Sequence, residues 1–322
     1  MYKVIGIDIS KETFDLAIKK HDHWINDQLK NNLNGFNALL KLLQLGDLVV
    51  MEASGPYYLP LSTFLYNQGI GVSVVNPLVI RRYSQMQLNR AKTDKKDAQV
   101  IASYAMSHTP SLWKPEEQGF VHLRQMFALR QNIEGQISSF NNQLHAFSAT
   151  GDLNKEVKSI LKSTVKTLEG KKKKIEREMD VIALKSYEHA ISRLESIPGI
   201  GRKTSTLLVV ITNDFEKFES YKQLIAYVGL SPRIYKSGSS INGKGHICKM
   251  GNGLIRKYLY LCTWTAKFKN KGCVEMYKRL NAKGKPERVI KVALANKLLK
   301  QAFAIVKHNT LYDENYIPKP CF

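Results

Sequence analysis

Strand and helix patterns alternate over residues 1–110. Apolar stretches with the residue types of buried strands are YKVIGIDI (2–9), TFDLAIK (13–19), DLVVME (47–52) and IGVSVVN (70–76). The first two are joined by the short turn SKE (10–12). Stretches with the spacing of helices are GFNALLKLL (35–43), YYLPLSTFLYNQ (57–68) and TDKKDAQVIASYAM (93–106). Strands that alternate with helices predict an α/β domain whose strands are parallel.

The pattern changes after this domain. Residues 111–190 contain few Gly or Pro, and their apolar side chains recur at helical spacing. We therefore expect a helical coiled-coil segment made of two long antiparallel helices, with a break near ATGDLN (149–154). Residues 191–310 have the pattern of a compact, mainly helical domain, and residues 311–322 are expected to form a tail.

Basic residues are concentrated toward the C-terminus. The 49 Lys and Arg outnumber the 27 Asp and Glu, which gives a formal net charge of +22. Residues 1–99 hold 12 basic and 9 acidic side chains, whereas residues 231–310 hold 18 and 2. A field of this strength attracts a polyanion, and nucleic acid is the partner that we expect. An anionic membrane surface is the competing partner, but no strongly amphipathic basic helix stands apart from the folded pattern.

Other signals favour a cytoplasmic protein. No apolar run approaches the roughly 18–20 residues that a membrane span needs. The N-terminus, MYKVIGIDIS, has the pattern of a strand and not that of a signal peptide. The spacing of Cys248, Cys262, Cys273 and Cys321 matches no usual zinc site, so we interpret them as reduced cytosolic thiols.

Four carboxylates lie where catalytic sites form in α/β domains. Asp8 is on the first strand and Glu52 ends a later one, followed by the turn-forming residues ASGP. Asp94 and Asp97 are three residues apart, which places them on one face of a helix. Strand tips and helix starts are the usual site positions in such sheets. In a protein this basic, the four acids are suited to holding two Mg²⁺ ions against a phosphodiester.

Each acid also has a structural interpretation. Asp8 can cap a turn, Asp94 can be the N-cap of its helix, and Asp97 can complement the helix dipole. Taken as a set and in this order, the four acids favour the metal site. Their order also looks like the DEDD signature of a RuvC-like, or RNase H-like, nuclease domain.

The C-terminal domain carries two further motifs. IPGIG (197–201) resembles the hairpin of a helix-hairpin-helix element, although a plain turn between helices is the alternative. A loop rich in Ser, Gly and Lys follows, and Ser237, Ser239 or Ser240 can act there as a nucleophile. From spacing alone, a flexible phosphate-binding loop is the simpler interpretation. The run KKKK (171–174) is most simply a solvated helix face, with a phosphate contact as the alternative.

The residues expected to contact nucleic acid lie in three regions: a predicted helix and the segment after it, the hairpin, and the serine loop with its flanks. They are Arg81, Arg82, Lys92, Gly199, Gly201, Arg202, Lys203, Arg233, Lys236, Lys244, Lys249 and Arg256.

The motifs GIDISKETFDLAI, VVMEASGPYY, NRAKTDKKDAQVIA, LESIPGIG and GLSPRIYKSGSSINGKGHICKMGNGLIRKYLY occur in this order. Together they resemble the transposases of the insertion-sequence-110 family, over about residues 2–308. The resemblance implies an N-terminal RuvC-like DEDD domain, a coiled-coil segment and a C-terminal transposase domain. It implies Asp8, Glu52, Asp94 and Asp97 as the Mg²⁺ ligands. It implies a serine that becomes linked to DNA, and Ser237 in YKSG is the best match, with Ser239 and Ser240 as alternatives.

The resemblance also implies partners. A structured noncoding bridge RNA would pair with donor and target DNA, and the protein would contact mainly backbone and shape. Related assemblies are tetramers made of two dimers, in which the acids of one subunit act with the serine of another. A prokaryotic cytoplasmic location, with association with the nucleoid during the reaction, follows from the same likeness.

Two other functions fit parts of the sequence. A hydrolytic nuclease or junction resolvase would use the same acids with water as the nucleophile, and no covalent protein–DNA species would form. A non-catalytic nucleic-acid-binding protein would use the acids only as caps and ion-pair partners. Metal dependence of an activity separates the second alternative from both enzymes.

Overall fold

The computed structural model describes residues 3–88, 93–149, 151, 153–233, 236–237, 241–242 and 246–315, the side chains of 236–237 and 241–242 excepted. The chain divides into two compact units, Met1–Glu116 and Glu117–Phe322. The segment that the sequence predicts as helical (111–190) and the predicted transposase domain (191–310) lie almost entirely within the second unit.

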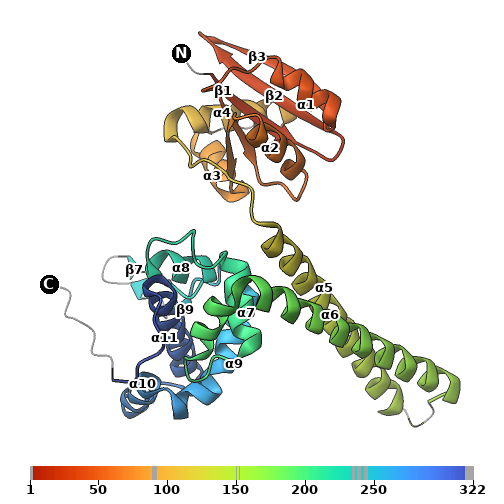
Figure 1. Cartoon of the computed structure of the whole chain (residues 1–322), viewed down its shortest axis with the longest axis vertical. Coiled ribbons are helices and arrows are strands. Elements are labelled where there is room, and N and C mark those ends of the chain that lie inside the picture. The colour runs from red at the N-terminus through yellow and green to blue at the C-terminus, as the bar shows by residue number, and fades with distance from the viewer. Residues whose placement is uncertain are drawn as a thin grey trace. The chain divides into compact units, whose positions relative to one another are not determined.

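The first unit is built on one mixed five-stranded sheet in the order β3-β2-β1-β4-β5 (Figure 1). Its strands are β1 (Val4–Ile9), β2 (Thr13–Lys20), β3 (His23–Lys30), β4 (Leu48–Glu52) and β5 (Gly71–Val75). Strands β1, β4 and β5 are parallel, as the sequence predicts, whereas β1, β2 and β3 form antiparallel pairs. The short turns after β1 and β2 allow only antiparallel neighbours, so the parallel pairing expected from the alternation of strands and helices is confined to β1, β4 and β5.

Helices cover both faces of this sheet (Figure 1). The helices are α1 (Leu33–Leu40), α2 (Tyr58–Asn67), α3 (Pro77–Met86) and α4 (Asp94–His108). Side chains alternate between the faces of a strand, so Ile5 and Ile7 of β1 join the core beneath α1 and α2. Val50 and Val75 point the other way and pack with α3 and α4.

Gly6 lies on the α4 face of β1. A β-carbon on Gly6 would collide with the backbone oxygen of Ala98 and the backbone nitrogen of Ala102. Both neighbours are backbone atoms of a buried helix, so they cannot turn aside as a flexible side chain does. The strand and the helix therefore approach each other at a distance that only glycine permits.

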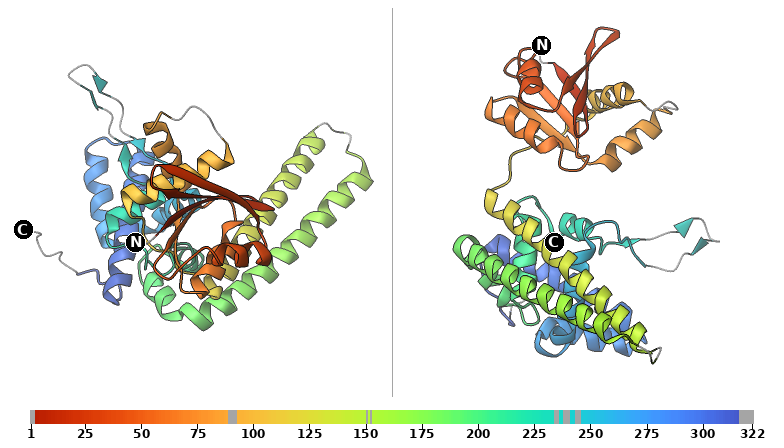
Figure 2. Two further views of the ribbon diagram at one scale, coloured as in Figure 1. Left: turned by 90° about the horizontal axis from the view of Figure 1, so that it is seen from above. Right: turned by 90° about the vertical axis from the view of Figure 1, so that its right-hand side faces the viewer.

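The second unit begins with two long helices, α5 (Gln118–Ala149) and α6 (Lys155–Glu195), which run side by side as a hairpin (Figure 2). The predicted break near residues 149–154 is confirmed. A buried guanidinium ties the hairpin to its neighbours: Arg130 of α5 donates to Glu176 of α6 at 2.8 Å and to the hydroxyl of Tyr258 at 3.0 Å. Lys203 also contacts Glu176, at 3.1 Å.

The rest of the second unit is mainly helical, as predicted. It contains α7 (Arg202–Thr212), α8 (Tyr221–Val228), α9 (Gly253–Lys269), α10 (Lys271–Ala282) and α11 (Glu287–His308). Between α8 and α9 lie two short antiparallel ladders, β6 (Pro232–Arg233) with β9 (His246–Ile247) and β7 (Lys236–Ser237) with β8 (Ile241–Asn242). The segment predicted as a loop thus contains paired backbone.

Two further observations concern the helices and the cysteines. Among the described residues, no helix has both the length and the apolar character needed to cross a membrane. Cys248, Cys262 and Cys273 are free thiols.

We expect Gly6→Ala to lower the melting temperature by several degrees, because overpacking against fixed atoms costs about 1–3 kcal/mol or more. Differential scanning fluorimetry of the full chain measures this effect. Gly135→Ala on α5 is the matched control, since a β-carbon there meets no atom within 4 Å and alanine favours the helix. An equal loss in both variants would contradict the close approach of Gly6 to α4.

Candidate active site

Asp8 and Glu52 lie side by side at the carboxyl ends of adjacent parallel strands. The register pairs Ile7 of β1 with Met51 of β4, so the next residue of each strand is an acid. Asp8 shares the α4 face of β1 with Gly6 because the two are separated by one residue. Glu52 is held by the hydroxyl of Ser54, which donates to its Oε1 at 2.8 Å. The small residues after β4 thus both turn the chain and orient this carboxylate.

Asp94 and Asp97 are the acids of the first turn of α4. Thr93 is the N-cap, and its hydroxyl accepts a hydrogen bond from the Lys96 amide at 3.3 Å. Asp94 as the N-cap, one of the structural interpretations above, was therefore wrong. Negative charges at the N-terminus of a helix interact favourably with the helix dipole. The packing of α4 on Gly6 places both acids on the same side of the sheet as Asp8.

The four acids influence one another electrostatically. The pKa of Asp8 is raised from 3.8 to about 6, first by burial and then by the charges of Asp97, Asp94 and Glu52. Negative charges near a carboxyl group disfavour its ionised form, and this raises its pKa. The structure thus places Glu52, Asp94 and Asp97 near enough to Asp8 for their charges to raise its pKa.

A fifth acid was missed by the sequence analysis. Asp15 of β2 is paired directly opposite Asp8, is only 5% exposed, and contributes to the raised pKa of Asp8. Its Oδ2 accepts a hydrogen bond from Gln28 of β3 at 2.9 Å. Counting registers back from the SKE turn would have found it, because that turn places Asp15 across from Asp8.

The donor chemistry of this cluster fits Mg²⁺. Carboxylate oxygens are the ligands that Mg²⁺ prefers, and a cation would relieve the repulsion that raises the pKa of Asp8. Within the described ranges, however, no three acidic, His or Cys side chains stand close enough together to hold one ion as they are. The acids that would hold the metal therefore lie near one another, but in this structure they are not close enough to coordinate one ion together.

The IPGIG motif forms the turn between α6 and α7. Gly199 has φ +107 and packs so closely on α9 that a β-carbon would lie 2.8 Å from the side chain of Ala266. Gly201, the N-cap of α7, has open space around it. Arg202 and Lys203 in the first turn of α7 contact acids, at 3.5 Å from Glu195 and 3.1 Å from Glu176 respectively.

The other predicted nucleic-acid contacts have varied surroundings. Arg81 and Arg82 are exposed on α3, and Arg233 and Lys249 are exposed near the short ladders. Arg256 instead donates to the backbone oxygen of Val228 at 2.6 Å, which satisfies a carbonyl at the end of α8.

The serine region is described only in part. Ser237 pairs with Ile241, and Lys236 with Asn242, in the ladder of β7 and β8. Among the predicted site residues, Lys92, Ser239, Ser240 and Lys244 lie outside the described residues, and so do the side chains of Lys236 and Ser237.

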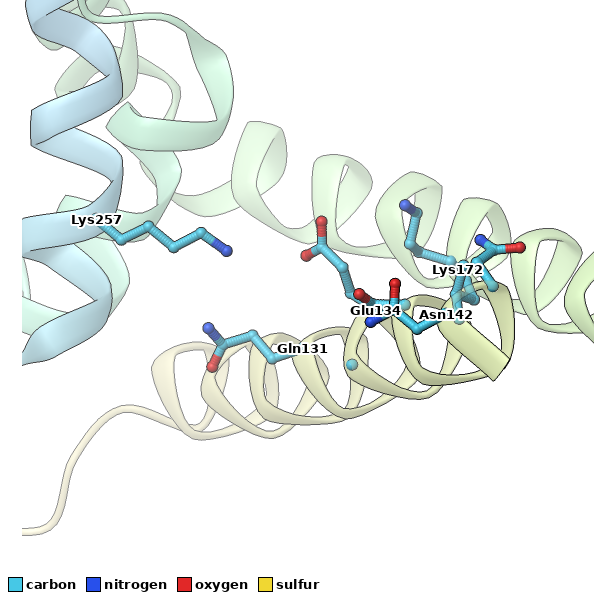
Figure 3. A pocket seen from close by; sticks show the side chains of 9 residues that line it. Gln131, Glu134, Asn142, Lys172 and Lys257 are labelled. Atoms are coloured by element: carbon cyan, nitrogen blue, oxygen red, sulfur yellow. The ribbon is translucent and has the colours of Figure 1, made fainter. Parts of the chain in front are cut away.

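A polar cavity of about 600 Å³ lies in the second unit where α5, α6 and α9 meet. Lys257 reaches from α9 toward Gln131 of α5, and Lys172 of α6 lies near Asn142 (Figure 3). The lining consists of side-chain amides, two lysines, Glu134, Ser138 and Gly135, with Ile137 as an apolar member. Its composition suits a polar ligand better than an apolar one.

Comparison with known proteins gives this geometry a context. Residues 5–147 match the IS110 DEDD family model, described as a transposase, and residues 191–278 match the model described as the IS116/IS110/IS902 transposase family. The first match contains all four acids and the second contains Ser237.

Relatives agree along nearly the whole chain. Pilin gene-inverting proteins of Moraxella bovis and Moraxella lacunata are each 30% identical over 319 residues, covering 96% of this chain and 97% of theirs. The transposase for insertion sequence element IS1111A of Coxiella burnetii is 25% identical, covering 80% of this chain and 76% of its own. Together these matches define an enzyme of DNA recombination. The chain belongs to the IS110 family of transposases.

A solved structure of Thermus thermophilus RuvC with a Holliday junction substrate matches 35% of this chain and 100% of its own. The TM-score is 0.28 and the identity 13%, so this likeness carries no argument about fold or activity.

We expect Asp8→Asn to raise the melting temperature by a few degrees in metal-free buffer at pH 7–8. A carboxyl whose pKa is raised from 3.8 to about 6 on folding destabilises the fold once it ionises, and this penalty is absent at lower pH. Asparagine keeps the shape and removes the charge. Millimolar Mg²⁺ should stabilise the wild type and leave Asp8→Asn unchanged, as measured by scanning fluorimetry.

The exposed Asp22 provides the control, since Asp22→Asn changes the same charge away from the cluster. Two results would contradict the assignment of Asp8 to a Mg²⁺ site: a wild-type melting temperature that does not change with Mg²⁺, or an equal rise in melting temperature in Asp22→Asn.

Proposed function

We propose that this transposase excises and inserts a mobile element through a serine–phosphate link to DNA. The observation that carries the proposal is the convergence of Asp8, Glu52, Asp94 and Asp97 from β1, β4 and α4, in a segment that matches the family model. Four carboxylates that converge in a chain of net charge +22 have an evident use if metal cations and phosphates complete the site. The mixed sheet with helices on both faces supports a RuvC-like assignment for the first unit.

In this reaction the Ser237 oxygen attacks a DNA phosphorus, and the bond from phosphorus to the 3′ oxygen breaks. The serine loses its proton and the departing 3′ oxygen gains one, so one phosphodiester is exchanged for another. Attack by a 3′-hydroxyl on the phosphoserine link reverses the step and joins a new pair of strands. No bond energy is lost to hydrolysis.

Mg²⁺, bound by the four acids, would supply electrostatic stabilisation of charge on the attacking and leaving oxygens. The protein's own part is to hold these carboxylates in place: Ser54 orients Glu52, and α4 presents Asp94 and Asp97 beside Asp8. Because the acids are in the first unit and Ser237 in the second, the two units must meet at the DNA. We propose a dimer or tetramer in which they come from different copies.

Sequence choice is proposed to lie in a structured bridge RNA that pairs with donor and target DNA. The basic second unit supports this part, because residues 231–310 hold 18 basic and 2 acidic side chains. Gly201 at the open start of α7, and the exposed Arg81, Arg82 and Arg233, are the contacts that we propose for phosphate backbone. The reaction would take place in the prokaryotic cytoplasm, at the nucleoid.

We expect Ser237→Ala to abolish the covalent protein–DNA adduct and to reduce recombination of a donor–target plasmid pair by several orders of magnitude. The adduct is measured by denaturing electrophoresis after incubation with labelled DNA and Mg²⁺. Ser239→Ala and Ser240→Ala are matched controls that should keep the adduct. An adduct that survives in Ser237→Ala would move the nucleophile to a neighbouring serine, and cleavage without any adduct would favour a hydrolytic nuclease.

We also expect a discrete structured RNA to co-purify when the protein is expressed with the DNA that flanks its gene. Removing this RNA with ribonuclease should abolish recombination, and adding back a transcript of the flanking segment should restore it. Recombination that survives complete ribonuclease digestion would contradict guidance by RNA.

A further inference from the structure

Helix α9 carries an exposed apolar face that its own unit does not cover. Leu261, Trp264 and Phe268 follow one another at intervals of three and four residues, which places them on one side of the helix. They are 52%, 53% and 71% exposed, whereas Leu259 and Ala266 on the other side are fully buried. Two large aromatic rings are therefore left in solvent on an otherwise well-packed helix.

The Trp264 ring is fixed by a buried cation. The ammonium group of Lys291 on α11 lies 3.3 Å from the centre of the ring, and Lys291 itself is 4% exposed. Glu287 pairs with Lys291 at 3.3 Å and accepts a hydrogen bond from the Tyr277 hydroxyl at 2.7 Å. Lys291 covers part of the Trp264 ring and holds it in place. The exposed part of the ring is therefore a fixed surface on which another flat ring can stack.

A second cation links the two aromatic rings. Lys267 lies 5.5 Å from the Trp264 ring centre and 5.0 Å from that of Phe268, and it pairs with Glu287 at 3.2 Å. Glu287 is thus shared between Lys267 and Lys291. The exposed rings are set in a positive surrounding.

The charge of the neighbouring helices indicates what covers this face. From Gly253 to His308 the chain holds 14 basic residues and 2 acidic ones, and Glu287 is one of the two. A protein partner with a plain apolar face would gain nothing from this excess of charge, whereas a polyanion with flat rings would use both features. Single-stranded nucleic acid has this chemistry: its phosphates bind cations and its unpaired bases stack on aromatic side chains.

The same face of α9 continues toward the polar cavity. Lys257 is four residues before Leu261, one turn along the helix, and it points into the cavity beside Gln131 (Figure 3). From Lys257 to Phe268 the helix rises by roughly 16 Å, at about 1.5 Å per residue. This length accommodates a few nucleotides, with bases at the aromatic end and phosphates at the lysine end.

We propose that the α9 face formed by Lys257, Leu261, Trp264 and Phe268 binds single-stranded nucleic acid. Unpaired bases stack on Trp264 and Phe268, and the strand continues toward Lys257 and Lys172 at the cavity. The proposal shares with the proposed function only the premise that the protein handles nucleic acid. It does not depend on the acids or on Ser237, and it adds a contact to bases where the proposed function has contacts to backbone.

The test uses the full-length protein and a fluorescein-labelled oligothymidylate about 12 nucleotides long. We expect Phe268→Ala and Trp264→Ala to weaken binding by roughly five- to a hundredfold each, as measured by fluorescence anisotropy, because stacking on one aromatic ring contributes this much. Unlabelled oligonucleotide should also quench tryptophan emission in the wild type, and this quenching should be lost in Trp264→Ala. An oligouridylate arm compares RNA with DNA.

Leu129→Ala on α5 is the matched control, since Leu129 is also 52% exposed but lies in another helix. Phe268→Ala keeps the test decisive if loss of Trp264 unfolds the region around Lys291. Asp22→Asn, at an exposed acid away from the acidic cluster, should bind the oligonucleotide as the wild type does. The anisotropy is measured with a chelator and without strand cleavage, so a failed active-site assignment and a failed stacking surface give different results.

Three results would overturn the proposal. The first is an oligonucleotide affinity of Phe268→Ala within twofold of the wild type. The second is quenching of tryptophan emission by a duplex of the same sequence that is as strong as quenching by the single strand. The third is a change in the sedimentation of the protein in the aromatic variants without a change in oligonucleotide affinity, in which case the face would be an interface between copies of the chain.

Discussion

The close contact between Gly6 and α4 determines where the acids of the first unit lie. Because Gly6 has no side chain, the backbone of α4 rests almost directly on β1 at Ala98 and Ala102. The first turn of α4 is one turn away, so Asp94 and Asp97 are carried to the end of β1 where Asp8 stands. The parallel pairing of β1 with β4 then adds Glu52. A larger residue at position 6 would move the helix and separate the acids.

The two units of the chain have complementary electrostatic needs. In the first, burial and neighbouring acids raise the pKa of Asp8, so a cation bound beside Asp8 would be stabilising. In the second, residues 117–322 hold 36 Lys and Arg against 17 Asp and Glu, and Glu176 and Glu287 are each shared between two cations. Nucleic acid together with divalent cations would supply the missing charge to both units, which is the physical basis of the proposed function.

The sequence predicts a large part of this architecture. Strong apolar patterns located β1, β2, β4 and β5, and the break between the two long helices was placed correctly. The four acids were singled out because strand tips and helix starts are visible in the pattern, and their role as metal ligands stays a prediction. Strand β3 was missed because it is a half-exposed edge strand, in which charged and polar residues hide the alternation.

Features that depend on three-dimensional contact could not be predicted in this way. Asp15 was missed because its place opposite Asp8 follows from the strand register that the SKE turn sets, and the apolar pattern alone does not give that register. Arg256 was expected to contact phosphate because it is a basic residue beside the serine loop. In the structure its side chain donates to the backbone oxygen of Val228 at the end of α8. The Trp264–Lys291 contact joins residues from two helices whose relative rotation no periodicity specifies.

The central claim is that the four acids form one metal site. Isothermal titration of the full-length protein with Mn²⁺, a spectroscopically visible substitute for Mg²⁺, tests it most directly when wild type and Glu52→Gln are compared. Glutamine keeps the shape of the side chain, and circular dichroism would establish that the fold is retained. The account predicts saturable binding to the wild type that weakens at least about tenfold, or 1.4 kcal/mol, in Glu52→Gln. Equal Mn²⁺ affinity in the two proteins would contradict it.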